Sequence, residues 1–248
     1  MNTPQPTPFR ILVIGDQCED VYSYGVIDRI SPEAPVPIFK LTHTETKPGM
    51  AANVAENLRA LGCRVTGIYG KISTKTRLID ERSKQHIVRI DNDISSEPLL
   101  SFDIDFSEYA AVIVSDYNKG LVSYETIECI RAQYSGPIFV DTKKRDLARL
   151  PNCIVKINEI EYNHTTSQCS DLIVTLGNRG AEYRGIVYDA VETEVADVCG
   201  AGDTFLAALV YEYISKENIT EAIKFAIKAA SITVQHIGVY SPTLSEIK

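Results

Sequence analysis

The chain has 248 residues, of which 44% are hydrophobic and 23% charged, a composition typical of a folded protein with one large domain and a sizeable core. The net charge of −8 argues against a nucleic-acid partner, because such partners need a basic surface. The sequence has no apolar stretch near the ~20 residues of a membrane span, and MNTPQPTPFR at its start does not resemble a signal peptide. We therefore expect a cytoplasmic protein without a membrane partner.

Short apolar runs alternate with helical patterns along the chain. The runs lack polar alternation, as expected for parallel strands buried on both faces. They lie at residues 11–14, 65–69, 111–114, 138–140, 154–157 and 172–174, and the helical patterns lie at 51–61, 124–134, 206–214 and 220–234. This alternation predicts an α/β fold with a doubly wound, mostly parallel sheet and helices on both faces.

Two segments do not fit the alternation. Residues 21–41 contain three prolines among short apolar stretches, and residues 76–91 suggest two strands around a polar turn. Together they predict a small antiparallel β sheet that projects from the main domain and acts as a lid over a site. The alternative is a hairpin at the sheet edge without a function of its own.

A short motif before the helical pattern at 206–214 carries the strongest functional signal. Gly200, Ala201 and Gly202 let the backbone approach an anion at a helix N-terminus, where free N–H groups and the helix dipole favour a phosphate. Asp203 follows at once and is suited to accept a proton from an attacking hydroxyl. The pattern predicts phosphoryl transfer without a Walker motif. The alternative is that Asp203 only caps the helix.

Polar residues follow nearly every predicted strand. Ligands of an open parallel sheet bind beyond the carboxyl ends of its strands, so these residues predict a ligand groove. Asp16 and Asp20 follow the first strand, and Asn53 lies near the start of the first helix, so the three could bind sugar hydroxyls. Lys143 follows the fourth strand and could bind a substrate phosphate, although a run of cations is often only a solvated face.

The chain resembles the ribokinase-like (PfkB) carbohydrate kinases over nearly its whole length. Four motifs in the family's order carry the resemblance: Gly49 to Asn53 for G-G-x-x-x-N, Asn158 to Glu161 for N-x-x-E, Thr175 to Gly180 for T-x-G-x-x-G, and Asp197 to Asp203 for D-x-x-G-A-G-D. The resemblance implies a single ribokinase-like domain over residues 1–248, with lid segments at about 21–41 and 76–91.

The resemblance also implies cofactors and residue roles. ATP would be the phosphate donor, Mg²⁺ would accompany it, and Asp203 would be the catalytic base, with the amides of Gly200, Ala201 and Gly202 as an anion hole. The implied roles of the remaining residues are as follows: Asp16, Asp20, Gly49, Asn53 and Lys143 for the sugar; Asn158, Thr175, Gly177 and Gly180 for the nucleotide; and Glu161, through water, and Asp197 for the metal.

Within the family, the likeness is greatest to kinases of a heptose phosphate. It rests mainly on residues 29–37, with support from 74–77, 115–120 and 140–143. It implies transfer of the ATP γ-phosphate to the anomeric hydroxyl of D-glycero-beta-D-manno-heptose 7-phosphate, and a homodimer formed through the lid. Two alternatives stay open, namely another sugar or nucleoside kinase of the same fold, and a ligand-binding relative with impaired catalysis.

The sequence departs from the family pattern at three places. Met50 replaces the second glycine of the G-G pair, and Ile227 stands where relatives usually have asparagine. A helix-containing unit that the family has between positions equivalent to Gly70 and Lys71 is missing. We expect these departures to affect which sugar is the substrate and how fast it reacts, and not the type of reaction.

Overall fold

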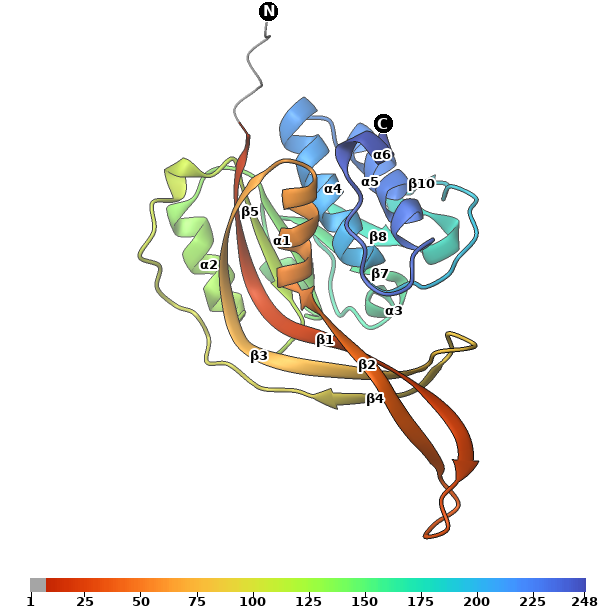
Figure 1. Ribbon diagram of the computed structural model, residues 1–248. Coiled ribbons are helices and arrows are strands. Elements are labelled where there is room, and N and C mark those ends of the chain that lie inside the picture. Colours follow the sequence, from red (N-terminus) through yellow and green to blue (C-terminus); the bar gives the residue numbers. More distant parts are fainter. Residues whose placement is uncertain (1–7) are drawn as a thin grey trace, which may run out of the picture.

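The computed structural model describes residues 8–248, and Figure 1 shows an α/β sandwich from which one part of the sheet projects. The predictions made for the first seven residues lie outside the described part. The strands are β1 (Arg10–Ile30), β2 (Pro37–Met50), β3 (Arg64–Asp80), β4 (His86–Asn92), β5 (Ala111–Asp116), β6 (Ile138–Thr142), β7 (Ile154–Asn158), β8 (Leu172–Thr175), β9 (Ala181–Tyr183) and β10 (Ile186–Tyr188). The α-helices are α1 (Ala51–Ala60), α2 (Tyr124–Gln133), α3 (Glu159–Tyr162), α4 (Ala201–Lys216), α5 (Ile219–Thr233) and α6 (Leu244–Ile247).

One sheet contains all of these strands, in the order β10-β9-β8-β7-β6-β5-β1-β3-β4, with β2 paired to β1. The pairings from β3 through β1, β5, β6 and β7 to β8 are parallel. The edge pairings, including β8 with β9 and β3 with β4, are antiparallel. The predicted mostly parallel sheet is confirmed.

Helices cover both faces of the sheet, as predicted. Along β1, Ile11 and Val13 pack into the core beneath α1, α4 and α5, while Leu12 and Ile14 pack into the second core beneath α2. All four side chains are fully buried. Figure 1 shows α2 on one side of the sheet and α1, α4 and α5 on the other. Burial on both faces explains why these strands appear as unbroken apolar runs.

The projecting part of the sheet differs from the prediction of a separate antiparallel sheet. It consists of the outer ends of β1 and β3 together with β2 and β4, and we call it the β projection (Figure 1). Its central pair, β1 with β3, is parallel and continues from the core, so that β1 is 21 residues long. The sequence did not reveal that β1 and β3 continue beyond the core, because the polar residues in their outer parts resemble those of a loop.

A bulge marks the point where β1 and β3 leave the core. The register passes from Gly15 opposite Tyr69 to Gln17 opposite Ile72, so that Asp16 faces two residues of β3, Gly70 and Lys71. The Gln17 side chain closes the gap by donating to the Gly70 carbonyl at 2.8 Å. These are the two residues between which the resemblance leads us to expect that a family unit is missing. The chain passes this point as a bulge, a feature that often redirects a side chain next to an active site.

Other differences from the predictions are small. Helix α4 begins at Ala201 rather than at residue 206, which places Asp203 in its first turn. The elements α3, β9 and β10 have only three or four residues each and were too short to give a periodic pattern. Ile227 packs into the core between α5 and its neighbours. Within residues 8–248, no helix is both long and apolar enough to cross a bilayer.

Candidate active site

Asp203 lies in the first turn of α4 and is almost fully buried, with 6% of its surface exposed. The Asn53 Nδ2 atom donates to Asp203 Oδ2 at 2.8 Å, and the Tyr117 hydroxyl donates to Asp203 Oδ1 at 2.9 Å. Burial raises the pKa of Asp203 to about 6, against the opposing effect of these two hydrogen bonds. A carboxylate with this pKa is ionised at neutral pH and can still take a proton, which suits a general base.

Asn53 owes its position to the start of α1. It is buried, and its own carbonyl and side-chain oxygen accept from Asn57 Nδ2 at 2.9 and 3.3 Å. Asn57 Oδ1 in turn accepts from the Thr204 hydroxyl at 2.8 Å. Asn53 and Asn57 therefore join α1 to the first turn of α4, and the Asn53 amide donates to Asp203.

The backbone before Asp203 has the geometry expected of an anion site. Gly200 adopts a φ of 77°, which favours glycine, and a methyl group there would press on Asn53 Nδ2 and Val239 at 3.0 Å. The N–H groups of Gly202 and Asp203 lie in the first turn, where the helix offers them no acceptor. A phosphate is a suitable partner for such groups.

A buried cation, Lys156, lies beside this backbone. Its ammonium would be 3.1 Å from a methyl group placed on Gly202, and it donates to Asp141 Oδ2 at 2.8 Å. Burial would lower the pKa of Lys156, but the attraction and hydrogen bond of Asp141, together with the charges of Asp203 and Glu161, raise it, so the amine stays protonated. Lys156 was not among the residues predicted from sequence. The available signal was a lysine inside an apolar strand, since a buried charge needs a partner.

Asp16 lies at the bulge in β1 and is 1% exposed. Its Oδ2 atom accepts from the backbone N–H groups of Tyr117 and Lys119, each at 2.9 Å. Its Oδ1 atom is buried and has no hydrogen-bond partner among the described residues. Burial raises the pKa of Asp16, with the Lys119 amide opposing it. A buried acceptor without a donor is costly, so Oδ1 is suited to a ligand hydroxyl.

Asp20 and Gly49, the other predicted sugar residues, are packed together in the structure. Asp20 forms a buried ion pair with Arg77 of β3. Gly49 lies so close to the Asp20 carboxylate and the Cys18 sulfur that any side chain would collide with them. This packing joins the three strands β1, β2 and β3 at the base of the β projection and explains the need for glycine at position 49.

The predicted nucleotide motif at Asn158 forms the start of α3. Asn158 Oδ1 accepts from the Glu161 N–H and Glu161 Oε2 accepts from the Asn158 N–H, each at 2.8 Å, as a capping box. Glu161 Oε1 forms an ion pair with Lys143, whose ammonium also lies 5.3 Å from the centre of the Tyr117 ring. Lys143 is thus close to the metal candidate Glu161 as well as to Tyr117.

The remaining motif residues shape loops. Gly177 and Gly180 have φ values of 61° and 92°, and a side chain on Gly180 would collide with the Tyr188 carbonyl. The Thr175 hydroxyl donates to the Ile157 carbonyl at 3.3 Å. Both Asp197 oxygens accept backbone N–H groups, from Cys199 at 3.0 Å and from Gly238 at 2.9 Å. Burial would raise the pKa of Asp197, yet these bonds lower it, and the arrangement favours a loop-bracing role for Asp197.

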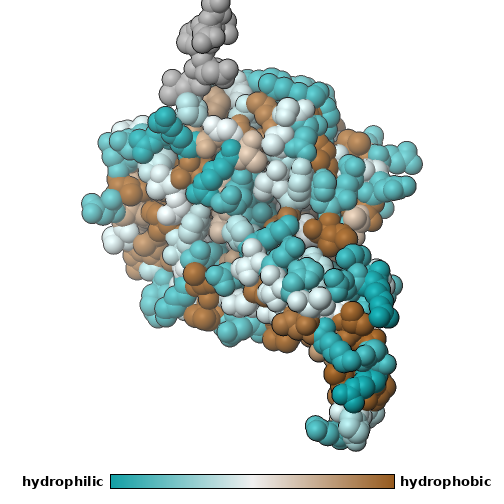
Figure 2. Space-filling view, in the orientation of Figure 1, coloured by the Kyte–Doolittle hydropathy of each residue, from teal (hydrophilic) through white to brown (hydrophobic). Residues whose placement is uncertain are grey.

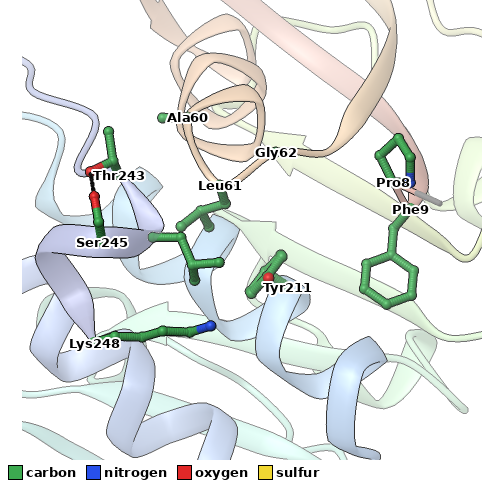
Figure 3. Close-up of a pocket in the computed structure, with 10 residues that line it drawn as sticks. Pro8, Phe9, Ala60, Leu61, Gly62, Tyr211, Thr243, Ser245 and Lys248 are labelled. Atoms are coloured by element: carbon green, nitrogen blue, oxygen red, sulfur yellow. Dashed lines mark hydrogen bonds between the residues drawn. The ribbon is translucent and has the colours of Figure 1, made fainter. Parts of the chain in front are cut away.

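The structure thus brings Asp16, Asn53 and Asp203 together beside the backbone of Gly200 to Gly202, in which the Ala201 N–H donates to the Val198 carbonyl at 3.3 Å. A separate shallow pocket at the far end of α1, shown in Figure 3, is lined by residues such as Leu61, Tyr211 and Lys248. Its described lining residues include no Asp, Glu, His or Cys. Within residues 8–248, no three His, Cys, Asp or Glu side chains gather to hold a metal ion by themselves.

Solved structures with the same architecture identify the fold. Ribokinase from Thermotoga maritima has a TM-score of 0.71 at 18% identity, covering 96% of this chain and 98% of that one. Phosphofructokinase-2 from Escherichia coli has a TM-score of 0.70 at 16% identity, covering 97% and 96%. The chain has the ribokinase fold.

Residues 130–246 match the family model described as pfkB family carbohydrate kinase, and the chain therefore carries a PfkB family domain. The matched family model and these solved structures are those of carbohydrate kinases. Among curated proteins, the chain is similar to the bifunctional protein HldE of a Nitratiruptor species, with 32% identity over 297 aligned positions, and of Campylobacter curvus, with 30% over 308. Each alignment covers 96% of this chain and 64% of the relative's length. The chain thus spans less than two thirds of these relatives.

Proposed function

We propose that this carbohydrate kinase transfers the ATP γ-phosphate to the anomeric hydroxyl of a heptose 7-phosphate. The observation that carries the kinase assignment is Asp203 at the N-terminus of α4, next to the anion-binding backbone of Gly202. The similarity to HldE proteins across 96% of the chain favours a heptose phosphate as the acceptor. The structural neighbours share only the fold and do not select among sugars.

The residues would act on two sides of the transferred phosphoryl group. On the acceptor side, Asp203 takes the proton of the sugar hydroxyl as its oxygen forms a bond to the γ-phosphorus. On the donor side, the bond from phosphorus to the bridging oxygen breaks, and its electron pair leaves with ADP. The N–H groups of the first turn of α4 and the ammonium of Lys156 stabilise the charge that spreads over the phosphoryl oxygens.

The site suits an Mg²⁺ ion that is bound mainly to the phosphates of ATP and to water. The ion usually keeps several waters and binds one or two carboxylates together with substrate phosphates, so a closed cage of protein ligands is not required. Glu161 and Asn158 bring one carboxylate and one amide to the edge of the sheet, and Glu161 would hold the ion through water. When bound, Mg²⁺ would neutralise charge on the ATP phosphates.

On the sugar side, Asp16 is the strongest candidate ligand. Its buried Oδ1 atom has no partner in the described chain, whereas Asp20 is already paired with Arg77. We therefore assign Asp16 a direct contact with a sugar hydroxyl and Asp20 a role in holding the strands of the site in place. Lys143, with its ammonium near the Tyr117 ring, would bind the phosphate of the sugar.

The test is a phosphorylation screen with purified protein, Mg²⁺ and ATP. Heptose 7-phosphate, ribose, fructose phosphates and adenosine are compared as acceptors, with product identified by mass spectrometry. Asp203→Asn keeps the shape of the side chain and should lower kcat by at least ~100-fold, the scale of a lost general base. The matched control is Asp171→Asn, because Asp171 contacts Tyr183 and Arg184 at the opposite edge of the sheet.

Each outcome decides between the alternatives. Preference for a different acceptor would retain the kinase and refute the heptose assignment. Binding of ATP and sugar without product from any acceptor would favour the ligand-binding alternative, which Met50, Ile227 and the bulge at Gly70 motivate. Turnover of Asp203→Asn within a few-fold of wild type would reduce Asp203 to a helix cap and refute the mechanism.

A further inference from the structure

Tyr117 places a hydroxyl group on the base of the proposed reaction. It follows β5 directly, is half-buried, and donates its O–H to Asp203 Oδ1 at 2.9 Å. Asp203 Oδ2 is occupied by the Asn53 amide at 2.8 Å. A sugar hydroxyl that loses its proton to Asp203 must donate to one of these oxygens. The Tyr117 hydroxyl donates to Asp203 in the same way, so it takes the place that the hydroxyl of the sugar substrate would have.

We propose that Tyr117 occupies the acceptor-hydroxyl position on Asp203 until a sugar displaces it, and so prevents the base from activating water against bound ATP. The inference rests on the proposed kinase function. It makes Tyr117 a positioning residue that selects a sugar hydroxyl over water. A sugar carries several other groups that bind the site and can compensate for the displaced bond, whereas a water molecule has only its own hydrogen bonds to offer.

The backbone around Tyr117 links this position to the sugar side of the site. The Tyr117 N–H donates to Asp16 Oδ2 at 2.9 Å, and the other oxygen of Asp16 has no partner among the described residues. A sugar hydroxyl that binds Asp16 Oδ1 therefore reaches the residue that anchors the Tyr117 backbone. Asn118 and Gly120 follow in a turn with φ values of 58° and 101°, which leaves the tyrosine at the start of a loop rather than inside a strand.

The unwanted reaction is hydrolysis. Water oxygen would form a bond to the γ-phosphorus, the bond to the bridging oxygen would break with its electrons leaving on ADP, and the water proton would pass to Asp203. With the Tyr117 hydroxyl in place, a water molecule has to share Asp203 Oδ1 with that donor or displace it, so water competes for the position in which it could lose its proton. Hydrogen bonds to charged groups are stronger than those between neutral groups, so this competition should matter.

The experiment compares wild type with Tyr117→Phe, which removes the hydroxyl and keeps the ring beside Lys143. ATP hydrolysis is measured without any acceptor, and transfer is measured with heptose 7-phosphate or whichever screened sugar wild type phosphorylates. We expect acceptor-free hydrolysis to rise by about tenfold, the factor that corresponds to one hydrogen bond to a charged group, and the sugar KM to fall. The control is Tyr134→Phe, whose hydroxyl donates to the Tyr109 carbonyl in the core beneath α2.

A pH profile supplies a second reading. The Tyr117 hydrogen bond lowers the pKa of Asp203, so its loss should move the acid limb of kcat/KM to higher pH. The other groups that face Asp203 are unchanged in this variant, namely Asn53, Asp141, Lys156 and Cys18.

Two results would overturn the proposal. Unchanged or slower hydrolysis without acceptor would show that Tyr117 does not protect the base. An equal fall of hydrolysis and transfer, with the sugar KM unchanged, would assign Tyr117 only to holding Asp203 in place. Failure of the kinase function is a separate outcome, because it appears as a wild type that phosphorylates no sugar while its acceptor-free hydrolysis can still be compared with the variant.

Discussion

Met50 offers a test in which strain and packing act in opposite directions. It is the residue just before α1, with φ 57° and ψ −133°, and it is 3% exposed. A residue with a Cβ atom rarely adopts this backbone conformation, whereas glycine does so freely. The family pattern has glycine here, so the chain carries a strained, buried methionine at the entry to the helix that holds Asn53.

The two contributions can be separated with Met50→Ala and Met50→Gly. Truncating a buried methionine to alanine typically costs ~2–5 kcal/mol, and both variants lose nearly the same side chain. Only glycine also relieves the backbone strain, which costs on the order of 1–3 kcal/mol for a residue held in such a region. We therefore expect Met50→Ala to be less stable than wild type, and Met50→Gly to be more stable than Met50→Ala by up to ~1–3 kcal/mol, the strain that glycine relieves.

The assay is denaturant unfolding of the three proteins, with the slope of the transition checked for equality. The matched control is Ala55→Gly, because Ala55 lies inside α1, where glycine should be less stable than alanine by at least ~0.5–1 kcal/mol. The order of alanine and glycine is thus opposite at the two sites. If Met50→Ala were the more stable of the pair, the strain argument would be refuted.

Three further predictions concern the charges of the site. The acid limb of kcat/KM should have its midpoint near the pKa of Asp203, about 6, with activity lost as pH falls through it because the base becomes protonated; a midpoint near 3.8, the usual pKa of a free aspartate carboxyl, would contradict this. Asp20→Asn leaves Arg77 buried without its carboxylate and should lower the free energy of unfolding by ~3–5 kcal/mol, measured by denaturation; a loss below ~1 kcal/mol would mean that Arg77 finds another partner or water. Asp16→Ala should raise the sugar KM and lower transfer while ATP affinity by calorimetry stays close to wild type; unchanged KM and kcat would remove Asp16 from the site.

The core of the fold could be predicted because its physical cause is local. Strands such as β5 are buried on both faces, so nearly every residue in them is apolar, and the run is visible without any knowledge of neighbours. The position of the candidate base was predictable for a similar reason. Gly200, Gly202 and Asp203 lie within four positions of one another, at the start of the helix that the structure shows.

The β projection could not be predicted in the same way. Its strands pair beyond the core, where β2 and β4 are mostly exposed, as Figure 2 shows by the mixture of apolar and polar side chains on the projecting hairpin. The exposed apolar residues on it include Ile30, Leu41 and Ile90. Because neither strand has a buried face, their apolar and polar residues do not alternate in a way that indicates a strand. Only the pairing of β2 with β1 and of β4 with β3 defines them. Whether this surface forms a lid or a dimer contact stays a prediction.

Tyr117 and Lys156 show the same limit within the site. A tyrosine after an apolar strand is commonly part of a core, and nothing near it in sequence indicates a contact with Asp203, which lies 86 residues further along the chain. The Lys156 ammonium finds Asp141 on the neighbouring strand β6 and Gly202 on α4. Such contacts depend on which strands are neighbours in the sheet, and sequence order alone does not give that arrangement.

The ion pairs around the groove distinguish the carboxylates that a protein cation contacts from those that have no such contact. Several acidic residues in and beside the site are held by cations in the described chain: Asp20 by Arg77, Asp116 by Lys144, Asp141 by Lys156 and Glu161 by Lys143. Asp16 and Asp203 are buried as well, yet their hydrogen-bond partners are only neutral donors. A buried carboxylate without a cation is expensive to keep ionised. In the proposed reaction, both of these carboxylates interact with hydroxyl groups of the sugar. Asp16 accepts a hydrogen bond from a hydroxyl of the bound sugar, and Asp203 takes the proton of the hydroxyl that is phosphorylated.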